Sequence, residues 1–401
     1  MATGTALVVG GGIGGCAAAL FLARTGMQVT LFETQPAPRD EVGAFLNLAP
    51  NGMAVLTELG IADRARTAGT PTDGIEFRNH RGRRLGRNPE QLLLIKRGTL
   101  NRVLRAAVEE QGIGIEFGRR LTGVHDDGRQ VTVEFADGST VSGDLLVGCD
   151  GIHSATRRAI LPHGPTPKYT GLVGTGGFVR SGISLPSSAT MHMTFGLRAF
   201  FGYQVTPWGE IYWFQNTPAD QPPAKDDPQA RQQFKQRLRD LHRDDHYPVP
   251  QIIDASDGGI GLFPIYDLQT LPAWHIGRTV LLGDAAHVMG PHSGQGASMA
   301  LEDAMVLAAY VRDNPGRVEA ALAGYEAERR PRVEHVVRLT RHLGNTKSPG
   351  PLGRVVRDLM LPIFLPMGVK TTARIYHSRP DWGTRRVDAR GVAQPSHAGA
   401  A

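Results

Sequence analysis

Apolar residues near the start of the chain follow the order strand, helix, strand. Ala6 to Val9 forms a continuous apolar run, as expected for a buried parallel strand. Ile13 to Thr25 has the composition of a helix, and Gln28 to Phe32 is a second strand-like run. These three segments predict a βαβ unit at the N-terminus.

Further helices and a hairpin are predicted in the next hundred residues. Gly60 to Arg66 and Thr99 to Gln111 are helical in pattern, and the second has apolar residues at helical spacing. Val131 to Phe135 and Thr140 to Val147 alternate around the turn Asp137-Gly138, which predicts two strands of a hairpin.

Aromatic residues are concentrated in strand-like segments between about Pro162 and Pro264, which predicts an antiparallel sheet carrying a wall of rings. Within this region, Asp227 and Pro228 provide a helix cap and first turn, and the helix should reach about His242. The later apolar run Leu359 to Val369 contains two prolines and is too short to span a bilayer. We expect ordinary core there, with a dimer or lid contact as the alternative.

A glycine-rich turn joins the first predicted strand to the first helix. The sequence from Gly10 to Gly15 fits G-x-G-x-x-G, and Glu33 ends the next strand. Gly10 would permit the tight turn, Gly12 the approach of a pyrophosphate, and Gly15 the packing of helix on strand. Because the helix N-terminus favours an anion and Glu33 can accept hydrogen bonds from a ribose, this pattern predicts dinucleotide binding.

Two later motifs complete the candidate chemistry. A buried strand ends in Asp150-Gly151, and Gly283 to His287 precedes a second glycine-rich loop, Pro291 to Gly296. Unpaired backbone N–H groups at Gly294 to Ala297, at a helix start, would stabilise negative charge on a reduced flavin. The alternatives are that Asp150-Gly151 is only a tight turn and that the loop glycines only permit a bend.

In this order and spacing, the three motifs resemble the single-component FAD-dependent aromatic hydroxylases, the family that includes para-hydroxybenzoate, salicylate and FAD-dependent urate hydroxylases. The likeness covers roughly residues 5 to 345 and includes Val42-Gly43-Ala44 through Pro50-Asn51-Gly52, and Arg97 with Leu100. It implies an α/β fold in which a three-layer, Rossmann-type FAD-binding domain is interleaved with an antiparallel-sheet substrate domain, followed by C-terminal helices.

The resemblance also implies roles for individual residues. Asp284 would hold the ribityl chain of FAD, Arg97 would contact the cofactor, and Asp150-Gly151 would support the use of FAD and NAD(P)H. Asn47 and Leu121 are implied as backbone contacts to flavin and adenine. The full set of expected cofactor positions is Gly10, Gly12, Ile13, Gly14, Gly15, Glu33, Asn47, Arg97, Leu121, Asp150, Gly151, Asp284, Pro291, Gly294, Gln295, Gly296 and Ala297.

By the same resemblance, NAD(P)H reduces non-covalently bound FAD, dioxygen adds to ring carbon 4a, and the hydroperoxide passes one oxygen atom to the substrate. No second glycine-rich nucleotide motif is present, so NAD(P)H would dock transiently as a co-substrate. The ring-rich region favours an aromatic or polycyclic secondary metabolite as substrate. Sequence leaves open which face of its sheet points inward, and the candidate contacts are Arg198, Tyr203, Tyr212, Phe214 and Gln215.

The expected division is an FAD-binding domain from 1–70, 96–164 and 265–345, a substrate domain from 71–95 and 165–264, a helical segment at 346–383 and a flexible tail at 384–401. Two alternatives to oxygen insertion remain at this point. One is an FAD-dependent reductase or oxidase on the same scaffold, similar to prenyl-chain reductases, and the other is a non-catalytic flavin-binding protein.

Composition narrows the remaining possibilities. The 401 residues are 41% hydrophobic and 20% charged, as in ordinary globular enzymes, and the net charge of +6 is scattered, which argues against a nucleic-acid partner. Two cysteines build no disulfide framework and favour a reducing cytoplasm. His242 and His246 lack a third ligand, so no metal is expected. We also expect no stable membrane insertion, and a monomer or homodimer.

Overall fold

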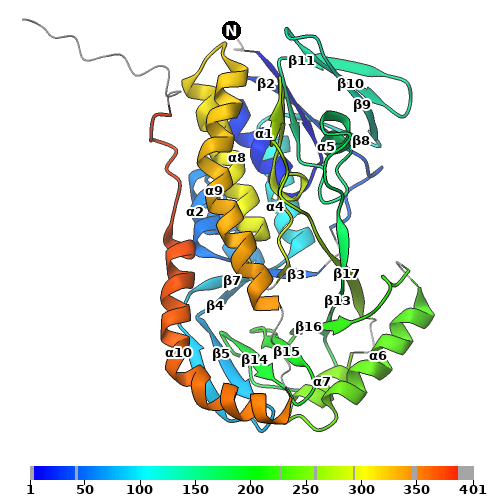
Figure 1. Cartoon of the computed structure of the whole chain (residues 1–401), viewed down its shortest axis with the longest axis vertical. Helices are drawn as coiled ribbons and strands as arrows, with labels where there is room; N and C mark the ends of the chain where they lie inside the picture. Colours follow the sequence, from blue (N-terminus) through cyan, green and yellow to red (C-terminus); the bar gives the residue numbers. More distant parts are fainter. Residues whose placement is uncertain are drawn as a thin grey trace, which may run out of the picture.

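The computed structural model describes residues 4–40, 44–224, 227–256, 260–291, 294–344 and 350–386. A parallel sheet forms the centre of the upper part of the molecule (Figure 1). Its strand order is β18 (His275–Ile276), β19 (Thr279–Leu281), β12 (Leu145–Gly148), β1 (Thr5–Val9), β2 (Gln28–Glu33) and β8 (Gly114–Phe117), and only β18 pairs antiparallel. The N-terminal strand is therefore central.

A larger, mainly antiparallel sheet occupies the lower part of the molecule in Figure 1. Its order is β17 (Gly261–Asp267), β13 (Lys168–Val179), β16 (Ile211–Pro218), β15 (Phe200–Val205), β14 (Thr190–Phe195), β5 (Gly74–Asn79) and β6 (Arg84–Asn88). Two small sheets accompany it: β3 (Phe45–Leu48), β7 (Leu92–Lys96) and β4 (Thr70–Thr72), and separately β11 (Thr140–Gly143), β10 (Val131–Phe135) and β9 (Leu121–Asp126). The division of the chain into domains stays a proposal, with which these sheets agree.

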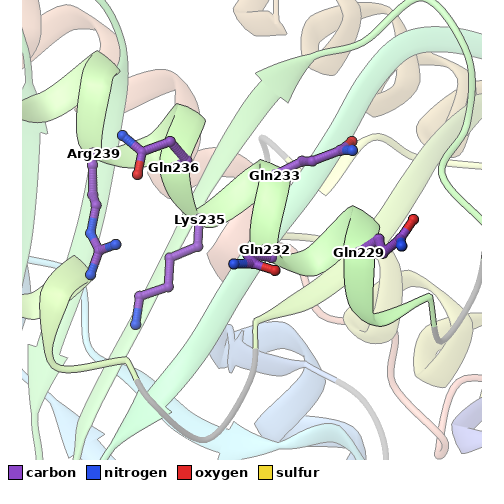
Figure 2. A pocket seen from close by; sticks show the side chains of 6 residues that line it. All are labelled: Gln229, Gln232, Gln233, Lys235, Gln236 and Arg239. Atoms are coloured by element: carbon purple, nitrogen blue, oxygen red, sulfur yellow. The ribbon is translucent and has the colours of Figure 1, made fainter.

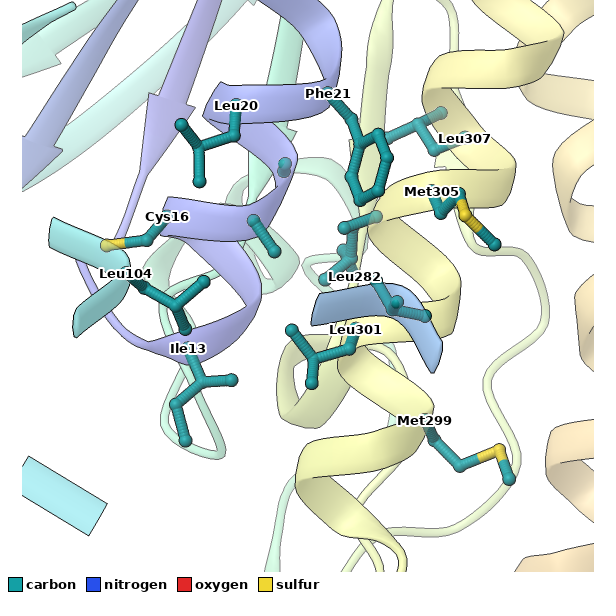
Figure 3. Close-up of a cluster of buried hydrophobic side chains, with 14 of the residues drawn as sticks. Ile13, Cys16, Leu20, Phe21, Leu104, Leu282, Met299, Leu301, Met305 and Leu307 are labelled. Atoms are coloured by element: carbon teal, nitrogen blue, oxygen red, sulfur yellow. The ribbon is translucent and has the colours of Figure 1, made fainter. Parts of the chain in front are cut away.

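Helices cover the parallel sheet because their buried faces are rich in small and aliphatic residues. Helix α1 (Ile13–Arg24) packs on α8 (Gly296–Asp313), and Figure 3 shows Phe21 of α1 near Met305 and Leu307 of α8. The other helices are α2 (Pro50–Glu58), α3 (Ala62–Ala68), α4 (Arg97–Glu110), α5 (Ala155–Ile160), α6 (Pro228–His242), α7 (Val249–Asp254), α9 (Val318–Gly344) and α10 (Pro351–His377). Within the described ranges, no helix has the length and apolarity needed to cross a bilayer.

The predicted second hairpin strand, Thr140 to Val147, is in fact two strands in different sheets. The chain leaves one sheet and enters the other at Asp144, whose backbone N–H donates to Thr5 O at 2.8 Å. Its carboxylate accepts from Thr5 N, also at 2.8 Å. The alternation of apolar and polar residues could not reveal this change of sheet, because β11 and β12 are both apolar on their buried side.

The prediction that Leu359 to Val369 belongs to the core is wrong. This stretch lies in α10, where Leu359 is 69% exposed and Ile363 is 63% exposed. Only one side of the helix meets the protein, and a Cβ on Gly86 of β6 would lie 2.3 Å from the side chain of Leu365.

Candidate active site

The glycines of the first turn have two different functions. Gly10 has a φ of 104°, and a Cβ there would lie 2.4 Å from the carbonyl oxygen of Cys149. A Cβ on Gly15 would lie 1.9 Å from Gly10 O, so both residues are glycine because of close packing. Gly12 differs, because a Cβ there would meet nothing within 4 Å. Gly12 therefore faces open space at the start of α1.

Glu33 is fixed at the end of β2 by backbone hydrogen bonds. Its Oε2 accepts from Gly11 N and its Oε1 from Gln35 N, both at 2.8 Å. The side-chain amide of Asn101 donates to Gly11 O at 2.8 Å, a contact that the sequence reasoning missed. Leu121 is buried at the start of β9, two residues after Arg119, whose N–H donates to Glu33 O at 2.8 Å. Leu121 therefore lies two residues beyond the segment that pairs with Glu33.

The Asp150-Gly151 turn is joined to the Gly283 motif through a buried arginine. The Asp150 carboxylate accepts from Thr156 N at 2.9 Å and from the Ser154 hydroxyl, which holds it at the start of α5. Arg157 of α5 then donates to Ala285 O at 2.9 Å. Two motifs far apart in sequence are therefore held together by one guanidinium.

Asp284 lies on the wall of a recess between these motifs. Its side chain is accessible to solvent, although many protein atoms lie around it. The loss of hydration that these atoms cause raises the pKa of the Asp284 carboxyl, and the nearby charges of Arg97 and His287 act in the opposite direction. Arg97 is exposed and has no side-chain hydrogen bond to any described residue, so it is available to a ligand. Asp284 and Arg97 therefore lie close enough for their charges to interact, and their roles toward a cofactor stay a prediction.

The start of α1 borders the same recess. A Cβ on Gly14 would lie 2.9 Å from the side chain of Leu282 and 3.3 Å from Ala300 of α8, so α1 begins where β19 ends and α8 begins. Ile13, the first residue of α1, is buried next to Leu104 of α4 (Figure 3). We call the open positions Gly12, Arg97, Asp284 and Gly296 together the cofactor recess.

The N-terminus of α8 opens into the cofactor recess. Helix α8 starts at Gly296 with no side-chain cap, so its first N–H groups have no partner within the helix, and a Cβ on Gly296 would meet nothing within 4 Å. The expectation for Gly294 is wrong in one respect, because its N–H donates to Pro291 O at 3.1 Å and is not free. His292 and Ser293 of this loop lie outside the described residues.

Several buried polar atoms near the start of α8 have no hydrogen-bond partner among the described residues. Asn51 donates to Gln295 Oε1 at 2.9 Å, which leaves the Gln295 Nε2 without an acceptor. Buried polar groups are nearly always paired, so these atoms are available to the polar groups of a ligand. The unpaired atoms of this region are Asn47 Oδ1, Asn51 Oδ1, His287 Nδ1, Gln295 Nε2 and Ser298 Oγ.

A buried ionic cluster supports the recess from behind, and the sequence reasoning missed it. Glu302 and Asp303 of α8 are fully buried, and Arg329 of α9 donates to them at 2.6 and 2.7 Å. Asp303 Oδ2 lies 2.6 Å from His287 Nε2 and accepts from Gly283 N at 3.3 Å. The cluster therefore fixes the turn that carries Asp284. The available signal was a pair of acidic residues inside an otherwise apolar helix.

One face of the large sheet forms an aromatic wall toward β3. The rings of Tyr212 and Phe214 lie 5.3 and 5.9 Å from that of Phe45, and the ring of Phe178 lies 4.8 Å from Tyr212. We call these four residues the aromatic wall. Tyr212 and Phe214 are thus brought together, as expected for residues of the same strand face.

The other three candidate substrate contacts lie away from the aromatic wall. Tyr203 packs with Trp213 on the opposite sheet face, under α6 and α7. Gln215 is buried there, and its Oε1 lies 3.3 Å from His242, the last residue of α6, which is also buried. Arg198 forms an ion pair with Asp244 near the end of α6. Strand alternation separates Gln215 from Tyr212, and sequence could not tell which face is inward.

A charged group borders the aromatic wall. The ammonium of Lys96 lies 4.6 Å from the ring centre of Phe178 and 3.3 Å from Glu210. Burial alone would raise the pKa of Glu210, but Arg180, Lys96 and the Tyr212 hydroxyl outweigh it and lower that pKa. The cluster of Lys96, Arg180 and Glu210 keeps one net positive charge beside the aromatic wall.

The helix layer behind the large sheet has a hollow of its own. Figure 2 shows that only polar side chains of α6 line it, so it lacks the apolar walls of a typical ligand site. Its lining residues are Gln229, Gln232, Gln233, Lys235, Gln236 and Arg239. We assign the chemistry to the cofactor recess and the aromatic wall.

The residues of the cofactor recess fit FAD. Open space at Gly12 and at the uncapped start of α8 would accept anionic or electron-rich groups, and Glu33 stands where a ribose would lie. Asp284 and Arg97 offer a carboxylate and a guanidinium on the wall between them. The fold and this recess together define a flavin-dependent oxidoreductase of Rossmann type.

Comparison with known proteins gives the family. A family model described as an FAD binding domain matches residues 3–340. Aurachin C monooxygenase/isomerase of Stigmatella aurantiaca is 34% identical over 348 residues, covering 84% of this chain and 88% of the relative. FAD-dependent urate hydroxylase of Klebsiella pneumoniae is 33% identical over 345 residues, with 83% and 87% covered.

A solved structure agrees with these relatives. The crystal structure of Klebsiella pneumoniae HpxO complexed with FAD and uric acid superimposes with a TM-score of 0.83 at 27% identity, covering 93% of this chain and 96% of that one. The chain belongs to the family of single-component FAD-dependent aromatic hydroxylases. The fold class, the FAD cofactor and the assignment as an FAD-dependent monooxygenase are therefore confirmed, and the reductase and non-catalytic alternatives are not supported.

Proposed function

We propose that this enzyme uses NAD(P)H to insert one oxygen atom of dioxygen into an aromatic or polycyclic small molecule. One observation carries the proposal. On β3, Asn47 lies beside the loop before α8, since a Cβ on Gly294 would be 4.0 Å from Asn47 O. Phe45, two residues earlier on the same strand face, belongs to the aromatic wall. A single strand therefore joins the cofactor recess to the aromatic wall within about 7 Å.

When bound, FAD would supply the redox chemistry, accepting a hydride and activating dioxygen. The residues of this chain would bind and orient. Asp284 and Arg97 would hold the cofactor in the recess, and the α8 N-terminus would stabilise negative charge on its ring through backbone N–H groups. Asn47 and Gln295 would satisfy polar groups at the ring edge with atoms that otherwise lack partners.

The aromatic wall would select and position the substrate. Its rings offer flat apolar contact, and Lys96 would attract an anionic or hydroxyl oxygen of the substrate. The solved structure compared above was determined with uric acid, and one of the relatives is named as a urate hydroxylase. By this comparison, we propose an electron-rich ring with an ionisable oxygen as the substrate class. The two free cysteines favour a reducing cytoplasm as the location of the enzyme.

The proposal is tested on purified protein carrying FAD. We expect NAD(P)H oxidation to accelerate when the right member of a panel of phenols, quinones, indoles and purines is added. With labelled dioxygen, one labelled oxygen atom should appear in the product. Product that forms without the label would rule out oxygen insertion and favour a reductase or oxidase.

Two tyrosines on opposite sheet faces test which face binds the substrate. Tyr212→Phe removes the hydroxyl that bonds Glu210 beside Lys96, and we expect KM to rise about five- to tenfold, the value of one hydrogen bond. FAD content should not change. Tyr203→Phe is the matched control on the other face, and its KM should stay within about twofold of wild type. Equal effects of both variants would contradict the assignment of the aromatic wall.

A further inference from the structure

Helix α10 presents large apolar side chains to solvent along more than four turns. Their exposed fractions range from 37% to 79%, and most of the large apolar side chains exposed on the described surface belong to this helix. We call the set the apolar strip: Leu352, Val355, Val356, Leu359, Met360, Ile363, Phe364 and Met367.

The charged residues of the same stretch point toward the protein. Arg354 donates to Leu197 O at 3.1 Å. Arg357 pairs with Asp358 at 2.7 Å, and its guanidinium lies 4.9 Å from the ring centre of Phe195. Asp358 also accepts from Asn79 at 2.8 Å. In this stretch the charged side chains face the protein and large apolar side chains face solvent, whereas an ordinary surface helix turns its apolar side to the core.

The spacing of the apolar strip is that of a helix-pairing seam. Its consecutive members are one or three residues apart and its alternate members are four apart, and no charged residue stands at an exposed position between Leu352 and Met367. Eight partly exposed side chains of this size give roughly 500 Å² of apolar surface, as large as the biggest patches on ordinary monomers. With the neighbouring rim, this approaches the ~800 Å² per partner of a standard interface.

We propose that the apolar strip is the interface between two copies of this chain, related by a two-fold axis. An uncharged strip is self-complementary, as such an axis requires. A lipid surface fits less well, because helices that lie on membranes display basic residues along their polar side and often an anchoring tryptophan. Here Arg354 and Arg357 are engaged inward, and α10 has no tryptophan.

The prolines of α10 indicate where the two copies would touch. Pro362 and Pro366 lie within the helix at exposed positions, on the side of the apolar strip. A proline opens the helix on its own side and bends it away, and α10 curves around the lower end of the molecule in Figure 1. The apolar strip is therefore convex, so two helices would cross near its middle, at Leu359 and Ile363.

The test is the mass of the full-length, FAD-loaded enzyme in solution, measured by light scattering at micromolar concentration. We expect twice the 43.2 kDa chain mass for wild type. The double variant Leu359→Glu/Ile363→Glu should raise the dimer dissociation constant at least about 100-fold, because it would bury charge at the crossing. Leu352→Glu, at the end of the strip, should have a smaller effect.

The control for the double variant is an exposed aromatic residue outside α10. Trp208→Glu replaces an exposed ring outside α10, 61% exposed, and should leave the dimer unchanged. Retained FAD absorbance in each variant shows that the fold is intact. A monomeric wild type, or a dimer that survives the double variant, would overturn the proposal. So would a monomer that floats with phosphatidylglycerol vesicles, which would assign the apolar strip to a lipid surface.

Discussion

Gly12→Ala is expected to lower FAD affinity about 10- to 100-fold while the apoprotein stays as stable as wild type. The added methyl group meets nothing within 4 Å in the protein alone, and the backbone at Gly12 is extended, so alanine fits without strain. It would, however, occupy the space through which a pyrophosphate approaches the start of α1. Overpacking by one methyl group costs about 1–3 kcal/mol, which gives the stated range.

Gly15→Ala is the matched substitution with the opposite expectation. Its Cβ would lie 1.9 Å from Gly10 O, a backbone atom that cannot move without displacing β1 from α1. We expect the free energy of unfolding of the apoprotein to fall by about 3 kcal/mol or more. Urea unfolding of apoprotein and FAD titration by fluorescence quenching measure both effects. If Gly12→Ala destabilised the apoprotein and bound FAD normally, the assignment of the cofactor recess would be wrong.

Arg329→Met is expected to lower the free energy of unfolding by about 3–5 kcal/mol at pH 7. The substitution leaves Glu302 and Asp303 buried with fewer positive charges, and removal of one partner from a buried ionic cluster is costly. Arg338→Met is the control on the same helix, because Arg338 is 61% exposed in its pair with Glu334. It should cost less than about 1 kcal/mol in urea unfolding.

The pH dependence of this loss gives a second measurement. In wild type, burial opposes ionisation, but Arg329 and Arg332 outweigh it at Glu302, His287 and Arg329 outweigh it at Asp303, and both pKa values are lowered. The stability they contribute is therefore present above their ordinary pKa values of 4.5 and 3.8 and is lost as the pH falls further. In Arg329→Met, burial should dominate and raise both pKa values. The difference from wild type should then shrink from pH 7 toward pH 5, and an unchanged difference would contradict this account.

The sequence predicted the elements whose signals are local. The turn Gly10 to Gly15 and Glu33 have a spacing that backbone geometry imposes, and the structure brings them together as expected. Helix α6 has the predicted bounds because Asp227 accepts from Gln229 N at 2.8 Å and Pro228 occupies the first turn.

What the sequence could not predict depends on contacts between distant segments. The assignment of Tyr212 and Gln215 to opposite sides follows from what packs on each sheet face, which alternation alone does not reveal. The arginine partners of Glu302 come from α9, about thirty positions away, so only its unusual place in an apolar helix was visible in the sequence. The sequence of α10 was ambiguous for the same reason, because a run of apolar residues looks the same in sequence whether it packs against the core or against a second copy of the chain.

The hydrogen bond from Arg157 to Ala285 O also limits when the cofactor site can form during synthesis, because both residues must have been made. These residues stand 128 positions apart, and the ribosome needs roughly 6–25 s to synthesise that interval. During that time β12 has no β19 beside it, so one edge of the parallel sheet is an open template for pairing with other chains. The nascent enzyme therefore passes through an interval in which it cannot yet hold FAD, and a chain truncated before β19 should aggregate instead of folding into a smaller flavoprotein.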